Sequence, residues 1–183
     1  CEKCNVAFIG PSAEVISRMG NKSEAKNTMR KAKVPVVPGT KEPVYTVEQA
    51  LEAVKEIGFP VMIKASAGGG GKGMRVAGNE QEFAKLFETA QQESVHSFSD
   101  NPMYLERFVE NPRHVEVQIL ADKYGNVVHL GERDCSVQRR HQKMIEESPC
   151  IAISDDLRKK MGETAVRAAK AAGYESAGTI EFL

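Results

Sequence analysis

A glycine-rich run with one lysine is the feature of this sequence that points most directly to chemistry. Residues 68–73 read Gly-Gly-Gly-Gly-Lys-Gly, which places five glycines in six positions. Without Cβ atoms, the backbone of such a run can approach a bulky ligand closely. Its N–H groups can point at one anion while Lys72 adds a positive charge. Two short apolar segments, 60–65 and 74–76, flank the run, so we predict a strand–loop–strand flap over phosphates rather than a flexible surface linker.

Two other phosphate-binding loops fit the run less well. A P-loop requires Ser or Thr directly after its Gly-Lys pair, and this chain has Gly73 there. The run matches the spacing G-x-G-x-x-G, but a dinucleotide-binding fold needs a helix to begin inside that motif. The residues that follow are strand-like. A flap between two antiparallel strands, as protein kinases place over ATP, agrees better with both flanks.

Charged side chains are dense in three further stretches. Glu106 and Arg107 lie in the middle of an expected strand, and His114 and Glu116 share one strand face because they are two residues apart. Residues 132–143, Glu-Arg-Asp-Cys-Ser-Val-Gln-Arg-Arg-His-Gln-Lys, have almost no apolar content but lie between strand-like runs. A basic run such as residues 139–143 is usually part of a solvent-exposed surface. Because this protein is neutral overall and also has a glycine flap, we favour the interpretation that the run binds a polyanion.

The elements that must position these residues alternate between helices and hairpins, which indicates an α+β fold. Capping residues predict helices that begin after Ser12, Ser23, Thr46, Asn79 and Ser154, with glycines ending three of them at 20, 58 and 173. The apolar patterns predict strands over 6–9, 60–65, 74–76, 103–109, 113–121, 127–130 and 178–183. The pattern at both ends indicates a fragment of a larger chain.

Bulk composition excludes several classes of function. The 183 residues contain 25 basic and 25 acidic side chains, so we expect neither nucleic-acid nor membrane binding. No apolar stretch approaches the ~18 residues of a membrane span, and we expect a cytoplasmic protein without a signal peptide. The four cysteines predict no metal site, because Cys1-x-x-Cys4 has no second pair at zinc-finger spacing. Cys135 and Cys150 are expected to be reduced thiols.

Four segments in order resemble biotin carboxylase of the ATP-grasp superfamily. They are 61–65 with the glycine run, 111–118 (Asn-Pro-Arg-His-Val-Glu-Val-Gln), 132–143, and 178–182 (Gly-Thr-Ile-Glu-Phe). The resemblance covers essentially the whole chain, and the segments around Arg113–Glu116 and Gln138–Lys143 are its most specific part. It implies a fragment of the ATP-grasp fold. Residues 1–35 would end an N-terminal domain, 36–108 would form a small α+β lid, and 109–183 would begin a C-terminal part built on an antiparallel sheet.

The resemblance also implies the reaction. Biotin carboxylases use MgATP and bicarbonate to form carboxyphosphate, and then carboxylate biotin on a carrier protein. The implied cofactors are ATP and magnesium or manganese, with biotin as the carrier-bound substrate. The implied partners are the biotin carrier protein and carboxyltransferase subunits or domains, for example those of acetyl-CoA carboxylase in fatty acid synthesis. We expect the full-length protein to be a homo-oligomer.

Site residues follow from the matching motifs. The resemblance assigns Lys143 to bicarbonate and phosphate as the catalytic residue and Glu181 to the metal ion. It assigns the following residues to ATP: Lys22, Lys64, Gly70, Gly71, Met74, Glu106, Arg107, Val109, His114, Gln138, His141 and Leu183. Two positions depart from the family pattern, since Ala67 replaces an expected glycine and Arg107 an expected lysine, which alters hydrogen-bond geometry.

The family needs a second acidic metal ligand, a catalytic glutamate and arginines for bicarbonate and biotin, which we expect beyond Leu183. The fragment alone is therefore expected to be inactive. Two alternatives remain open at this point. One is another ATP-grasp ligase, such as half of a carbamoyl phosphate synthase, against which the 139–143 segment argues. The other is a non-catalytic nucleotide-binding module.

Overall fold

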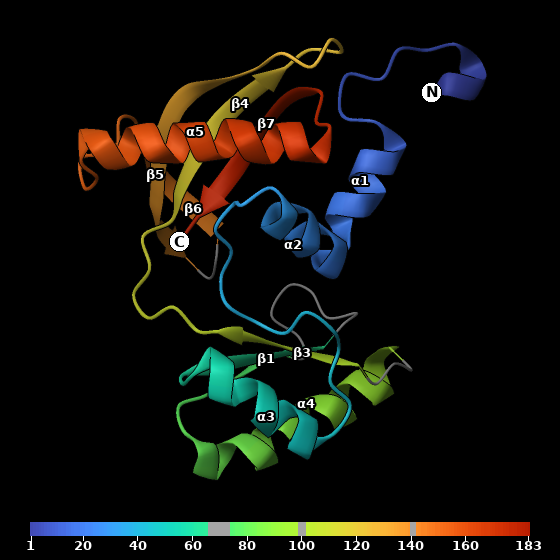
Figure 1. Cartoon of the computed structure of the whole chain (residues 1–183), viewed down its shortest axis with the longest axis vertical. Coiled ribbons are helices and arrows are strands. Elements are labelled where there is room, and N and C mark those ends of the chain that lie inside the picture. Colours follow the sequence, from blue (N-terminus) through green and yellow to red (C-terminus); the bar gives the residue numbers. More distant parts are fainter. Residues whose placement is uncertain (66–73, 99–101, 140–141) are drawn as a thin grey trace. The chain divides into compact units, whose positions relative to one another are not determined.

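A computed structural model describes residues 1–65, 74–98, 102–139 and 142–183 (Figure 1). The described residues form two compact units. Unit 1 consists of Cys1–Val36 and Asn111–Leu183, and unit 2 of Val37–Glu110. Unit 2 differs from the predicted lid, 36–108, by one residue at its start and two at its end. Its role as a lid stays a prediction.

Unit 2 is a three-stranded antiparallel sheet with two helices on one face (Figure 1). Its strands are β1 (Val61–Ala65), β2 (Met74–Ala77) and β3 (Met103–Arg107), in the order β2-β1-β3, and its helices are α3 (Val47–Ile57) and α4 (Glu80–Phe98). Residues 61, 63 and 65 of β1 are buried against the helices with Phe83 and Phe87. Lys64 therefore lies on the other face of the sheet. The antiparallel pairing of β1 with β2 confirms the predicted hairpin, while the tip that joins them is outside the described residues.

Unit 1 is built on a four-stranded antiparallel sheet in the order β6-β5-β4-β7. The strands are β4 (Val115–Ala121), β5 (Val127–Arg139), β6 (Gln142–Glu147) and β7 (Ser176–Phe182). Helix α5 (Asp155–Ala172) crosses one face, where Met161 and Ala165 pack on the alternate residues 115, 117 and 119 of β4 (Figure 1). The unit also contains the short 3-10 helix η1 (Glu2–Cys4) and the helices α1 (Ala13–Gly20) and α2 (Lys22–Lys31). The mixture of helices with antiparallel sheets confirms the α+β class.

Most predicted helix ends are confirmed by their caps. The side chains of Ser12, Thr46, Asn79 and Ser154 each accept a hydrogen bond from a backbone N–H three residues later. The prediction of Ser23 as a cap was wrong. Helix α2 begins at Lys22, and the side-chain oxygen of Asn21 accepts from Glu24 N at 3.2 Å. Asparagine is as good a cap as serine, and the sequence offered both.

Three strand predictions need correction. Residues 6–9 form no strand, and Val6, Phe8 and Ile9 are exposed, because no described strand pairs with this segment. Strand β3 ends at Arg107 rather than at 109. Residues 132–139 do not lie between strands but continue β5, and β6 follows as a strand that was not predicted. Apolar alternation fails here because acidic residues occupy the buried positions of β5.

Candidate functional site

A row of charged side chains crosses the face of the unit 1 sheet that points away from α5. Glu116 of β4 pairs in register with Glu181 of β7 on one side and with Arg133 of β5 on the other. Residues directly opposite on neighbouring strands share a face, and the neighbours of Glu116 on β4, 115 and 117, point to the helix side. Lys143 of β6 reaches the same place, where its Nζ donates to Glu116 Oε2 and lies 3.3 Å from Glu181 Oε1. We call Glu116, Arg133, Lys143 and Glu181 the charged row.

Glu116 is the centre of the charged row. Its side chain is only 4% exposed, and it accepts hydrogen bonds from Arg133 Nε at 2.8 Å, from a second Arg133 nitrogen and from Lys143. Burial by itself raises the pKa of Glu116, but the hydrogen bonds from Lys143 and Arg133 outweigh burial and hold the pKa below its ordinary value. The hydrogen bond to Glu116 in turn raises the pKa of Lys143. Both cations are therefore fixed as cations at neutral pH.

His114 stands beside the charged row, one residue before β4 begins. Its Nδ1 lies 2.8 Å from the side-chain nitrogen of Gln138, and its Nε2 lies 3.3 Å from Glu181 Oε1. The same Gln138 nitrogen lies 2.8 Å from the carbonyl oxygen of Cys135, which can only accept, so this atom is the amide nitrogen and donates to both. With Gln138 donating to Nδ1, a neutral imidazole carries its proton on Nε2, which is buried and has no hydrogen-bond partner among the described residues.

Unit 2 holds a second pair of predicted site residues. Lys64 of β1 forms an ion pair with Glu106 of β3 on the sheet face away from the helices, where their side chains are 21% and 18% exposed. The register places Glu106 opposite Met62, so the pair is diagonal across the two strands. A largely buried ammonium group is costly unless it is paired with an anion, and in the structure that anion is the carboxylate of Glu106.

The other predicted residues of unit 2 lie on its strands or just beyond them. Met74 begins β2 and pairs in register with Lys64, and Val109 is half-buried after the end of β3. Arg107 donates through a guanidinium nitrogen to the carbonyl oxygen of Ile57 at 3.2 Å, which ties it to the end of α3.

The structure thus brings together His114, Gln138, Lys143 and Glu181 in unit 1, and Lys64, Met74 and Glu106 in unit 2. Arg107 is directed to the end of α3 instead, and Val109 lies two residues beyond β3. Leu183 is exposed at the end of β7 and joins neither group by a described contact. Gly70, Gly71 and His141 are outside the described residues. Lys22 begins α2, but its side chain is likewise not described.

Arg133 of the charged row was not among the site residues predicted from the sequence. Glu116 was noted for its spacing from His114 but was assigned no role. Successive residues of a strand point to opposite faces of the sheet. Once 132–139 is recognised as part of a strand, Arg133 and its neighbour Asp134 are therefore assigned to opposite faces, and this could have identified Arg133.

Buried acids on the helix side of β5 have a structural role. Glu132, 4% exposed, accepts from Arg158 Nε of α5 at 2.8 Å and from Cys150 N at 3.1 Å. Burial raises the pKa of Glu132, but the hydrogen bonds from Arg158 and the backbone outweigh it and lower the pKa. These contacts tie the segment before α5 to the sheet.

The donor set of the charged row suits a hard cation only in part. Oxygen or nitrogen atoms of His114, Glu116 and Glu181 lie within 4.8 Å of one another. Glu116 is already saturated by two cationic side chains. Glu181, whose side chain is 55% exposed, offers the hard carboxylate oxygen that Mg²⁺ prefers, and Mg²⁺ commonly takes only one or two protein carboxylates. Glu181 therefore fits as one ligand of a magnesium ion.

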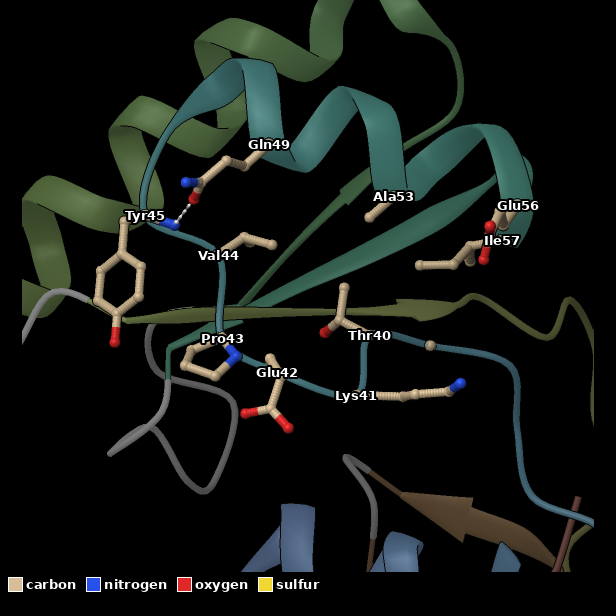
Figure 2. A pocket seen from close by; sticks show the side chains of 11 residues that line it. Thr40, Lys41, Glu42, Pro43, Val44, Tyr45, Gln49, Ala53, Glu56 and Ile57 are labelled. Carbon is tan, nitrogen blue, oxygen red and sulfur yellow. Dashed lines mark hydrogen bonds between the residues drawn. The ribbon is translucent and has the colours of Figure 1, made fainter.

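A groove of about 500 Å³ in unit 2 is separate from these residues. Figure 2 shows that it runs between the segment 40–45 and α3, with Val44, Ala53 and Ile57 in its wall. Gln49 is engaged there by a hydrogen bond from Tyr45 N. None of the predicted ATP-binding residues is among its lining residues, so the groove is not evidence for the predicted site.

Among the described helices, none combines the length and the apolar character that crossing a membrane requires.

Comparison with known proteins identifies relatives for the whole chain. The family described as the carbamoyl-phosphate synthase L chain, ATP binding domain, matches residues 21–183. The chain is 57% identical to a biotin carboxylase of Nostoc sp. and 54% identical to biotin carboxylase 1 of Bacillus subtilis, in each case over all 183 residues. It spans 41% of the length of both relatives.

Solved structures give the same result. A biotin carboxylase–beta-gamma-ATP complex from Campylobacter jejuni matches with a TM-score of 0.88 and 53% identity, over 100% of this chain and 41% of that one. The biotin carboxylase domain dimer of Hydrogenobacter thermophilus 2-oxoglutarate carboxylase, solved with MgADP, ADP and bicarbonate, matches with a TM-score of 0.86 and 49% identity. It covers 100% of this chain and 40% of that one. The predicted resemblance to biotin carboxylase, an ATP-grasp ligase, is confirmed.

Proposed function

We propose a function on the basis of family membership: this chain belongs to the family described as the carbamoyl-phosphate synthase L chain, ATP binding domain. The chain would supply part of the ATP and bicarbonate site of a biotin carboxylase. The full-length protein would use ATP and bicarbonate to form carboxyphosphate, and would then carboxylate biotin on a carrier protein.

The observation that carries this proposal is the charged row with His114 beside it. Lys143 is held as a cation by Glu116 and is 29% exposed, so its ammonium can also contact an anion from solvent. Bicarbonate and the transferred phosphoryl group are both anions. Phosphoryl transfer depends mainly on positioning and on stabilising developing charge, and a fixed cation meets both needs.

The other residues would bind the nucleotide and its metal. Glu181 would hold Mg²⁺, or Mn²⁺, whose charge neutralises phosphate oxygens when it is bound. His114, Gln138, Lys64 and Glu106 would contact the nucleotide, and the glycine run would donate backbone N–H groups to it.

The cellular setting is part of the same proposal. The full-length protein would be cytoplasmic and homo-oligomeric, and would work with a biotin carrier protein and a carboxyltransferase. Acetyl-CoA carboxylation for fatty acid synthesis is the use that we infer for it.

The test is bicarbonate-dependent ATP hydrolysis, measured with and without free biotin, in the full-length protein and in its Lys143→Gln variant. We expect biotin-dependent turnover in the native protein and a loss of at least 100-fold in the variant, since removing one such charged group costs about 10²–10³ in rate. Lys159→Gln, on the exposed side of α5, is the matched control and should retain full activity. ATP hydrolysis that responds to ammonia instead of biotin would support a carbamoyl phosphate synthase and overturn the proposal.

A further inference from the structure

His114 is held by three hydrogen-bonding contacts from one segment of β5, residues 135–138. It lies outside the strand ladder, since β4 begins at Val115, so its placement depends on other contacts. The hydroxyl of Ser136 accepts from His114 N at 3.0 Å, and the N–H of Cys135 donates to the carbonyl oxygen of His114 at 2.7 Å. On the side chain, Gln138 donates to Nδ1 at 2.8 Å while Glu181 lies 3.3 Å from Nε2.

Asp134 fixes the serine that holds this backbone. One oxygen of Asp134 accepts both the hydroxyl of Ser136 and the N–H of Ser136, the latter at 2.9 Å. Its other oxygen lies 3.2 Å from an Arg113 guanidinium nitrogen and 3.4 Å from the sulfur of Cys150, which donates. Because the serine proton is committed to Asp134, the serine oxygen presents a lone pair to His114 N.

The strand is irregular at this segment. The pairing of β5 with β6 shifts register between Asp134 and Val137, and again between Val137 and Gln138. Such a bulge re-aims side chains. Here it accompanies the turn of Ser136 and Gln138 toward His114, while Asp134 stays on the buried side at 9% exposure.

We propose that Asp134 and Ser136 are positioning residues that set the orientation of His114, and through it the affinity of the site for nucleotide. The inference rests on the proposed function, in which His114 contacts ATP. The two residues act by fixing the backbone of His114 while Gln138 fixes its ring. The hydrogen bonds to Ser136 are also the largest cause of the lowered pKa of Asp134, which keeps this carboxylate an acceptor at neutral pH.

The first experiment is steady-state kinetics of the full-length protein with Ser136→Ala. Loss of a net ~1 kcal/mol from the hydrogen bonds that hold His114 predicts about a fivefold rise in KM for ATP. The kcat should change by less than twofold, because the lost interaction is made equally in ground and transition states. Ser136→Thr keeps the hydroxyl and should restore KM. Ser148→Ala is the control, since it removes a hydroxyl that bonds the carbonyl oxygen of Glu132 at 2.9 Å and should leave KM unchanged.

The second experiment asks whether Asp134 acts through Ser136. Asp134→Asn should raise KM for ATP in the same direction, and the double variant should be no worse than the more severe single variant, because the two residues form one path. Additive effects would show two independent roles and overturn the proposal. An unchanged KM in Ser136→Ala, or an equal rise in Ser148→Ala, would overturn it as well.

A third measurement needs no substrate, and so separates this proposal from the proposed function. Ring ¹⁵N shifts of His114 in the 183-residue chain, at a pH of about 8.5 where ordinary imidazoles are neutral, should report the Nε2–H tautomer alone. In Ser136→Ala, the ring should show averaged shifts of both tautomers, and in Ser136→Thr the single tautomer should return. A single tautomer in Ser136→Ala would refute the positioning role even in a protein that turns over ATP. Averaged shifts in a protein without such turnover would support positioning while removing the proposed function.

Discussion

Replacing Glu116 by glutamine should destabilise unit 1 by about 3 kcal/mol at pH 7, the lower end of the cost of removing one partner of a buried ion pair. Glutamine keeps the volume and one acceptor oxygen but removes the charge that faces Arg133 and Lys143. The side chain of Glu116 is only 4% exposed, which makes the loss large. The two cations are 28% and 29% exposed, so water can solvate them in part, and the lower end of the range applies. For a chain of this length, ~3 kcal/mol corresponds to a fall in Tm of about 6–12 °C.

The matched control is Glu146→Gln. Glu146 also faces Arg133, at 3.5 Å, but its side chain is 44% exposed. Ion pairs of this kind contribute about 0.2–1 kcal/mol, so Tm should fall by at most about 4 °C. The assay is urea unfolding at pH 7, which gives the free energy of unfolding for the native chain and both variants. Equal losses in Glu116→Gln and Glu146→Gln would refute the argument that burial makes the Glu116 pair strong.

The loss of unfolding free energy in Glu116→Gln should depend on pH. The pKa of Glu116 is lower in the folded protein than its ordinary value of 4.5. A carboxyl of this kind stabilises the fold above about pH 4.5, and its contribution disappears as the pH falls through the folded-state pKa. The difference in unfolding free energy between the native chain and Glu116→Gln should therefore be constant from pH 7 to pH 5.5 and should shrink below about pH 4.5. A difference that grows on acidification would mean that the sign of the pKa shift is wrong.

Three further outcomes test the site and the fold. Lys64→Gln in the full-length protein should weaken ATP binding at least tenfold, whereas Lys55→Gln, in an exposed pair of the same unit, should leave the Kd for ATP unchanged by calorimetry. Burial raises the pKa of Cys135 and Cys150, so these thiols should react with a thiol reagent only in denaturant. The exposed Cys1 and Cys4 should react at once in the native chain. Gly173→Ala, at a helix C-cap with φ 66°, should cost ~1 kcal/mol in urea unfolding. Gly20→Ala, with no neighbour within 4 Å and no positive φ, should be neutral or stabilising.

Local signals in the sequence predicted helices better than strands. The caps at Ser12, Thr46 and Ser154 are confirmed because a helix start depends on a side chain and a backbone group three residues apart. A strand depends on its partner, which is far away in the sequence. The segment 6–9 has a strand pattern but no described partner. Residues 132–139 lack the pattern but pair with β4 and β6 on both sides.

The sequence motifs selected residues that are neighbours in the structure, but they did not show which contacts these residues make. The motifs singled out Lys143, His114 and Glu181, and the structure places the first two each 3.3 Å from Glu181 Oε1. The sequence could not show that Glu116 joins them, because the register of β4 against β5 and β7 sets which charged side chains become neighbours. A shift of one residue would turn Glu116 into the helix face.

Both lysines that the sequence assigned to anions are paired with carboxylates in the structure, Lys64 with Glu106 and Lys143 with Glu116. The second pair limits how Lys143 can bind an anion. Glu116 is buried and bonded to Arg133 as well, so moving it away from Lys143 would break two ion pairs at once. Lys143 should therefore keep this partner when an anion binds. An ammonium group has three N–H donors, of which one is directed to Glu116 and one to the half-exposed Glu181, and the third can serve the anion. Glu116 then sets the position and charge of Lys143 in the free protein, so that little reorganisation would remain on binding of the anion that we propose for this site.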